Sequence, residues 1–265
     1  MNLEKLCFEV QSVAKTVGTF IAGERKKFTL DQVEVKGKAN FVSYVDKKAE
    51  EMIVGALLNI LPGSGFIAEE GTAGSSDEKY KWVIDPLDGT TNFIHGLPPF
   101  AVSIGLMDED EIVLGVVYEI TQDECFYAWK DSKAYLNGKE ITVSTASNTK
   151  DALIATGFPY YQFDKIDSYI SAMHYFMLNS HGLRRLGSAA TDMAYVAAGR
   201  FEAFWEQGLH PWDVAAGTII IRQAGGKVSD FKGGNDFLFN GEMVASNGAY
   251  YNEFYSIVHK YFVIS

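Results

Sequence analysis

The chain has 265 residues, of which 47% are hydrophobic and 22% are charged, values close to those of an average globular protein. These values exclude a disordered, collagen-like or coiled-coil protein, and the length suffices for a large core without disulfides or structural metals. With 23 Lys and Arg against 34 Asp and Glu, the net charge is −11. That balance disfavours nucleic acid as a partner, because phosphate backbones are bound by clustered Lys and Arg.

Cysteine usage and the N-terminus indicate where the protein works. The two cysteines, Cys7 and Cys125, lie far apart and form no zinc or disulfide framework, which suits a reducing compartment. Glu4, Lys5 and Glu9 interrupt any apolar signal segment. No run approaches the roughly 18 to 20 apolar residues of a membrane span. We therefore expect a soluble cytoplasmic protein that has no contact with membranes.

Residues 1–145 are predicted to form two helices and then a mainly antiparallel sheet. Apolar residues at steps of three and four predict helices over 3–20, with Gly23 as the stop, and over 46–61. The polar segment between them can form a mobile strand pair. Strands are predicted at 66–68, 82–84, 100–106, 112–120, 124–129, 134–136 and 141–143. Asn137-Gly138 predicts a tight hairpin between the last two.

Beyond a short polar stretch at 144–150, strands alternate with helices. Strands are predicted at 153–156, 183–186 and 201–205, and helices at 164–179, 188–198 and 213–224. Ser188 is the expected N-cap of its helix, and Gly199 follows its end. This alternation is typical of an α/β fold. We therefore divide the chain into an N-terminal α+β lobe, 1–145, and a C-terminal α/β lobe, 146–265.

The most informative segment covers residues 82–93. An apolar strand leads into Asp85, and a Pro and a Gly then turn the chain, so that Asp85 and Asp88 can converge with the Leu87 carbonyl. Oxygen ligands alone suit a hard cation such as Mg²⁺, which also binds substrate phosphate. A solvated turn is the plain alternative for two acids at this spacing.

The flanking residues favour the metal site over the solvated turn. If the amides of Gly89 and Thr90 open a helical turn, they form a cradle for an anion. A second apolar strand ends in Glu69-Glu70, and two adjacent strands would aim their acids at one crevice. Carboxylates for metal beside amides for phosphate indicate metal-assisted hydrolysis of a phosphoester. Asp213 and Asp46, each at the start of a predicted helix, are further candidates for which a plain N-cap is the alternative.

Three motifs, in this order, resemble the inositol monophosphatase family. They are Glu69-Glu70-Gly71, residues 85–93 (DPLDGTTNF) and residues 212–217 (WDVAAG), and the similarity covers residues 46–226. The resemblance implies a layered α-β-α-β-α sandwich of the sugar-phosphatase type. It also implies two or three Mg²⁺ ions per active site, for which Mn²⁺ substitutes, lithium sensitivity and a homodimer.

The resemblance also implies a role for individual residues. Ligands of the first metal would be Glu69, Asp85 and the Leu87 carbonyl. Ligands of the second would be Asp85, Asp88 and Asp213, with Asp85 bridging. The catalytic set would be Glu69 together with Thr90 and Asp46, the pair that orients the attacking water. Phosphate would lie on Gly89 and Thr90, and the remaining substrate contacts would be Asp88, Gly187, Ser188, Ala189, Glu206 and Asp213.

Other charged residues are less defined by the sequence. Lys36 and Lys38 either close over phosphate or belong to a solvated loop. Arg184 and Arg185 either pair with acids or line an interface. His210 lies close enough to Asp213 in sequence to support it.

The favoured function is hydrolysis of inositol monophosphate to inositol and phosphate by an activated water. Fructose-1,6-bisphosphatase and 3′(2′),5′-bisphosphate nucleotide phosphatase of the same superfamily are the alternatives. Residues 91–93 (TNF) resemble the inositol branch more than the nucleotide branch. A non-catalytic regulator that binds RNA or the transcription machinery is an alternative of another class. The acidic site and the net charge of −11 argue against it.

Overall fold

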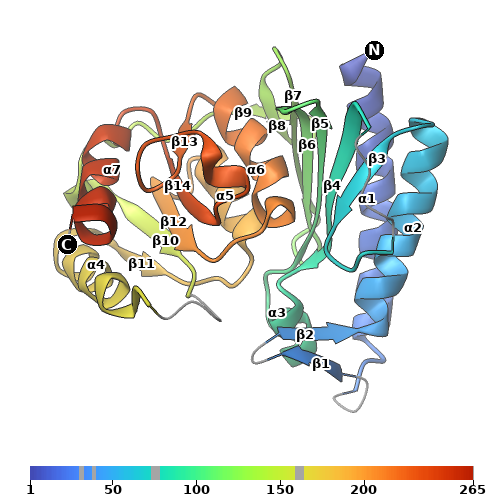
Figure 1. The fold of residues 1–265 in the computed structure, drawn as a ribbon, viewed down its shortest axis with the longest axis horizontal. Helices are drawn as coiled ribbons and strands as arrows, with labels where there is room; N and C mark the ends of the chain where they lie inside the picture. The colour runs from blue at the N-terminus through green and yellow to red at the C-terminus, as the bar shows by residue number, and fades with distance from the viewer. Residues whose placement is uncertain (30–32, 38–39, 73–77, 159–163, 265) are drawn as a thin grey trace.

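The computed structural model describes residues 1–29, 33–37, 40–72, 78–158 and 164–264, with the backbone alone at 33–37 and 40–42. Helices and sheets alternate in layers across the molecule (Figure 1). The long helices are α1 (Leu3–Arg25), α2 (Tyr44–Ile60), α4 (Ile166–Asn179), α5 (Ala189–Ala197), α6 (Pro211–Gln223) and α7 (Tyr251–His259). Helices α1 and α2 cover one sheet, α4 and α7 cover the other, and α5 and α6 lie between the two sheets. The predicted α-β-α-β-α sandwich is confirmed.

The larger sheet has seven strands in the order β3-β4-β5-β6-β7-β8-β9. Its strands are β3 (Gly65–Ala68), β4 (Tyr80–Asp88), β5 (Ala101–Asp108), β6 (Glu111–Glu119), β7 (Glu124–Trp129), β8 (Ala134–Leu136) and β9 (Lys139–Ile141). Only β3 and β4 pair in parallel, and the rest of the sheet is antiparallel as predicted. The hairpin at Asn137-Gly138 is confirmed, with φ of 47° and 83° at the two residues.

The smaller sheet has five strands in the order β11-β10-β12-β14-β13. They are β10 (Leu153–Thr156), β11 (Gly182–Arg184), β12 (Ala203–Gln207), β13 (Lys227–Ser229) and β14 (Glu242–Ser246). The remaining elements are the pair β1 (Val33–Gly37) and β2 (Asn40–Ser43), the short helix α3 (Thr90–His95), two single 3₁₀ turns (Thr149–Asp151 and Asp236–Leu238) and a final π-helical turn (Lys260–Ile264). None of the helices in these described stretches is long and apolar enough to cross a membrane.

Helix α6 packs closely against the larger sheet, and this packing fixes the position of the first turn of the helix beside the sheet. Gly115 of β6 has no room for a side chain, because a Cβ there would lie 2.5 Å from the carbonyl oxygen of Ala216. Strands β5 and β6 are therefore buried on both faces, under α1 on one side and α6 on the other. One large apolar core cluster lies at this junction and combines residues of both halves of the chain. The lobe boundary near residue 145 stays a prediction.

Several predicted boundaries differ from the structure. Gly23 does not end the first helix, because it keeps a helical backbone and α1 runs on to Arg25. Strand β12 extends beyond residue 205 and contains Glu206, which was expected to follow the strand. Strands β13 and β14 and helix α7 were not predicted at all.

Candidate active site

Glu69 and Asp85 meet at the ends of two neighbouring strands. Because β3 and β4 run in parallel, Ala68 pairs with Ile84, and the residue after each of these is an acid. The Glu69 amide donates to the Ile84 carbonyl at 3.3 Å, which extends the pairing by one more bond. The two acid-bearing strands are thus adjacent as predicted, and Glu69 and Asp85 both line one cleft.

Asp88 is brought beside Asp85 by an irregularity in β4. The strand does not end at Asp85 as expected but continues to Asp88, and its register against β5 shifts between these two residues. A shift of this kind re-aims side chains that a regular strand would point to opposite faces. The Leu87 amide donates to Oδ1 of Asp85 at 2.9 Å, which fixes that carboxylate within the turn.

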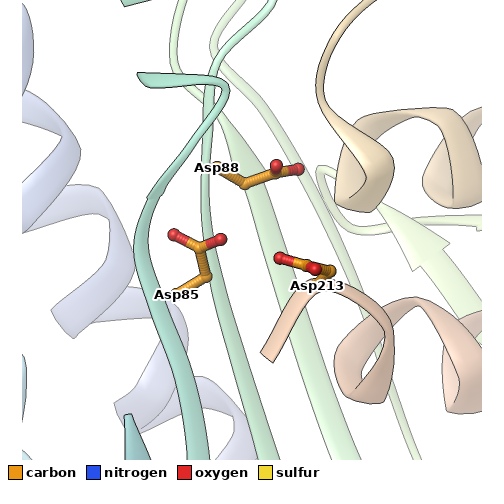
Figure 2. Close-up of side chains that lie close together, drawn as sticks. All are labelled: Asp85, Asp88 and Asp213. Atoms are coloured by element: carbon orange, nitrogen blue, oxygen red, sulfur yellow. The ribbon is translucent and has the colours of Figure 1, made fainter. Parts of the chain in front are cut away.

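Asp213 comes from the first turn of α6. It is not the N-cap but lies three residues beyond the cap, His210, whose amide donates to Asp213 Oδ2 at 2.7 Å. Figure 2 shows the carboxylates of Asp85, Asp88 and Asp213 directed toward a common space. One oxygen from each lies within 4.8 Å of the others.

Asp88 also links strand β4 to the start of helix α5. Its Oδ2 accepts from the Ser188 hydroxyl at 2.6 Å and from the Ala190 amide at 2.7 Å, both at the start of α5. Ser188 is the N-cap of α5 as predicted, and its hydroxyl also lies 2.7 Å from Thr191 Oγ1. The amide of Ala189 is a further donor to this carboxylate, and together with the other two it opposes the rise that burial causes in the pKa of Asp88.

The acids of this cluster have raised pKa values. Burial, followed by the charge of Asp213, raises the pKa of Glu69 to about 8, and burial followed by Asp88 raises that of Asp213 to about 7. Burial also raises the pKa of Asp88 to about 6, against the lowering effect of the Ser188 hydrogen bond. For Asp85, burial and the charge of Glu69 raise the pKa well above its ordinary value.

Such crowded carboxylates repel one another unless protons or cations lie between them. Their all-oxygen donor set matches hard divalent cations such as Mg²⁺. The residues present therefore fit the metal that the sequence predicts.

Thr90 and Asp46 form a hydrogen-bonded pair beside the cluster. The Thr90 hydroxyl lies 3.1 Å from Asp46 Oδ1 and 3.0 Å from the Leu87 carbonyl oxygen. The other oxygen of Asp46 accepts from the amide and the hydroxyl of Ser43, at 2.8 and 2.6 Å. Asp46 is thus the third residue of α2 within a capping box, not its N-cap. Burial raises its pKa, while these hydrogen bonds lower it.

Gly89 turns the chain from β4 into α3. Its φ is +93°, and a Cβ there would lie 3.0 Å from the Pro99 carbonyl oxygen, so only glycine fits. Gly89 is the N-cap of α3, and because it has no side chain, it makes no capping hydrogen bond to the first amides of this helix. The helical turn that the anion cradle requires therefore begins at Thr90.

Most of these groups border one cleft of about 360 Å³. Of the residues predicted for the site, those that line it are Glu69, Asp85, Leu87, Asp88, Gly89, Thr90, Gly187, Ser188, Ala189, Glu206 and Asp213. Asp46 is not among them, since it is 1% exposed and reaches the cleft only through Thr90.

Comparisons with known proteins agree with this architecture. The model of the inositol monophosphatase family matches residues 2–262. The chain belongs to this family. It is 45% identical to an inositol-1-monophosphatase of Mesorhizobium japonicum, over 82% of either chain. It is 42% identical to the Nus factor SuhB of Pseudomonas aeruginosa, over 88% of either chain. The structure of the extragenic suppressor protein suhB of Bartonella henselae has a TM-score of 0.88 and 38% identity, covering 94% of this chain and 96% of that one.

In this member of the family, Glu206 lines the cleft from β12, a strand of the smaller sheet. It is 8% exposed, and a Cβ on Gly157 would overlap its carboxylate, so the glycine leaves the room that Glu206 occupies. Burial raises the pKa of Glu206 to about 8, and the Arg185 guanidinium opposes that shift.

The sequence analysis missed other residues of the cleft, namely Gly157, Phe158, Asp192 and Gln207. Asp192 is fully enclosed, and its Oδ1 has no hydrogen-bond partner among the described residues. An acid within the otherwise apolar helix α5 was the only available signal for it. Gln207 follows Glu206 on β12 and gave no signal.

The remaining predicted groups have different surroundings. Arg185 lines the cleft with its guanidinium 5.2 Å from the centre of the Phe158 ring, whereas Arg184 donates to the Leu183 carbonyl. The imidazole of His210 stacks on Trp212 at 4.7 Å, next to Asp213. The Lys36 side chain and Lys38 lie outside the described residues.

Proposed function

We propose that this chain is a Mg²⁺-dependent phosphatase that hydrolyses phosphate monoesters, with inositol monophosphate as its preferred substrate. One observation carries the proposal: three carboxylates converge within 4.8 Å in a cleft that also holds the start of α3. Family membership and the inositol-1-monophosphatase relative support the reaction and the choice of substrate. The protein is proposed to act in the cytoplasm as a homodimer.

In this proposal Glu69, Asp85 and the Leu87 carbonyl would hold one cation, and Asp85, Asp88 and Asp213 would hold a second. A third site and replacement by Mn²⁺ remain part of the proposal. When bound, the cations lower the pKa of water and stabilise charge on the leaving oxygen. The amides of Gly89 and Thr90 orient the phosphate.

Asp46 and Thr90 handle the proton of the attacking water. A threonine hydroxyl that donates to a carboxylate presents its own oxygen as an acceptor. Thr90 can thus accept a hydrogen bond from water while its proton is directed to Asp46. Elsewhere in the cleft, Glu206 and residues 187–189 contact the hydroxyls of the substrate, together with Asp88 and Asp213.

Removal of divalent cations is expected to abolish activity. Crowded carboxylates repel an anionic phosphate unless cations lie between them, so turnover in excess chelator should vanish and return with Mg²⁺ or Mn²⁺. Ca²⁺ should inhibit, because its larger coordination sphere tolerates geometries that misplace the reacting oxygen atoms. Li⁺ should inhibit as the resemblance implies. Phosphate release from inositol-1-phosphate is the measurement, and full turnover in chelator would contradict the metal-dependent mechanism.

Glu206→Gln is expected to change substrate choice more than chemistry. Its carboxylate accepts hydrogen bonds from ring hydroxyls in this proposal, and cations bound in the same cleft would favour its ionised form over the protonated form that burial favours. Loss of one such bond costs about 1 to 3 kcal/mol, which corresponds to a roughly 5- to 150-fold rise in KM for inositol phosphate. An aryl phosphate has no ring hydroxyls and serves as the control, so its KM and kcat should stay near wild type. Equal losses on both substrates would indicate a structural role instead.

A second candidate function is regulatory binding. It is favoured by the relative that carries the name Nus factor. The enzymatic proposal is tested by measuring phosphate release by the purified protein from four compounds: inositol-1-phosphate, fructose-1,6-bisphosphate, adenosine 3′,5′-bisphosphate and NADP⁺. Turnover of none of them in Mg²⁺ would leave the regulatory candidate in its place.

A further inference from the structure

Glu50 is a buried carboxylate of α2 with no part in the chemistry proposed above. Its side chain is fully buried, and it lies one helical turn after Asp46. Burying a carboxylate is costly unless its oxygens accept hydrogen bonds. The partners of Glu50 therefore indicate what this buried group is for.

The recorded partners of Glu50 belong to the segment that follows β3 and carries Glu69. Oε2 accepts from the Glu70 amide at 2.7 Å. Oε1 accepts from both the amide and the hydroxyl of Thr72, each at 2.7 Å. The backbone between these two residues turns at Gly71, which has φ of +67°. The turn directs both amides at a single side chain.

Glu69 is therefore held from two sides. Its own amide is bonded to β4, and the next residue along the chain is bonded to α2 through Glu50. Glu69 in turn interacts with Asp85 on the neighbouring strand and with the charge of Asp213. Without Glu50, the segment after β3 would lose three hydrogen bonds, and the Glu69 carboxylate would lose its anchor on that side.

We propose that Glu50 is a positioning residue that sets the Glu69 carboxylate in place for binding a divalent cation. The inference rests on the proposed role of Glu69 as a metal ligand. Residues that orient metal ligands typically contribute 10- to 100-fold to metal affinity. Helix α2 then supports both sides of the site, because Asp46 on the same helix holds Thr90.

Glu50→Gln is the direct test. Both carboxylate oxygens of Glu50 accept hydrogen bonds, whereas the side-chain nitrogen of Gln can only donate, so it would face another donor from Glu70 or Thr72. In calorimetric titration with Mg²⁺, this variant should bind about 10- to 100-fold more weakly than wild type. Hydrogen exchange at the amides of Glu70 and Thr72 should become faster. Hydrolysis of an aryl phosphate should recover at high Mg²⁺, which a general loss of folding would not allow. Glu51→Gln is the matched control, since Glu51 is exposed and pairs with Lys48 at 2.9 Å.

A double-mutant cycle identifies the route of the effect. If Glu50 acts through Glu69, then Glu50→Gln should cause no further loss of Mg²⁺ affinity in a Glu69→Gln background. Thr72→Ala removes one of the three bonds without burying a new polar group, and its affinity should lie between wild type and Glu50→Gln.

The outcomes separate this inference from the proposed function. A wild-type protein that fails to bind Mg²⁺ would overturn the proposed function. Wild-type affinity in both Glu50→Gln and Thr72→Ala, or independent losses in the cycle, would overturn the role of Glu50 and leave the proposed function in place.

Discussion

Replacement of Asp85 with Asn is expected to abolish turnover while the metal-free protein becomes no less stable. Glu69, Asp88 and Asp213 are the charged neighbours of Asp85, and in the proposed site Asp85 is the acid that would contact both cations. The loss should exceed the roughly 10- to 100-fold typical of residues that only orient ligands. We expect kcat/KM to fall by more than about 10³-fold, with weaker Mg²⁺ binding by calorimetry.

The stability of the metal-free variant separates loss of a ligand from loss of the fold. The folded-state pKa of Asp85 is raised, so its ionised form opposes folding at every pH above the unfolded-state pKa. A neutral Asn removes this cost to folding, and its side-chain oxygen can still accept a hydrogen bond from the Leu87 amide. The Tm of Asp85→Asn in chelator at neutral pH should therefore equal or exceed that of wild type. A lower Tm together with unchanged Mg²⁺ affinity would remove Asp85 from the metal site.

The sequence predicts the acids of the site better than it predicts how they are brought together. Glu69 and Asp85 follow short apolar runs, and that pattern alone indicates strands ending at a common edge. The shift in register between Asp85 and Asp88 could not be predicted, because it depends on how β4 pairs with the next strand, β5, and the local sequence does not mark where that pairing shifts. Ser188 as N-cap was predictable from its local sequence, but its bond to Asp88 was not.

Contacts between distant segments account for what was missed. Glu206 was expected after its strand, yet β12 continues because residues 206 and 207 pair with Met243 and Glu242 of β14. Strand β14 was itself not predicted, so this extension had no local signal. Asp46 and Asp213 were each weighed against a plain N-cap. In both cases the acid is the third residue of the helix, and its side chain accepts a hydrogen bond from the amide of the N-cap residue. This arrangement can be recognised only when the first residue of the helix is known.

The last prediction separates orientation of water from metal binding. Thr90→Ala removes a hydroxyl that contacts Asp46, but it leaves the amide of residue 90 and all the carboxylates of the cluster in place. Binding of Mg²⁺ and of inorganic phosphate should therefore remain close to wild type. If the hydroxyl aligns the attacking water and passes its proton to Asp46, kcat should fall by roughly 10²- to 10⁴-fold. Thr90→Ser keeps the hydroxyl and should retain most of the activity.

Asp46→Asn should resemble Thr90→Ala, because the two groups act as one unit. Asp46 is bonded to Ser43 by one oxygen and to Thr90 by the other, so an Asn at this position retains an acceptor but loses the charge that receives the proton. The double variant should be little worse than either single one, since removing both members of a unit costs no more than removing one. Calorimetric Mg²⁺ titration beside kcat for wild type and the three variants measures this. Wild-type kcat in Thr90→Ala, or losses that multiply in the double variant, would show that the water is oriented without this pair.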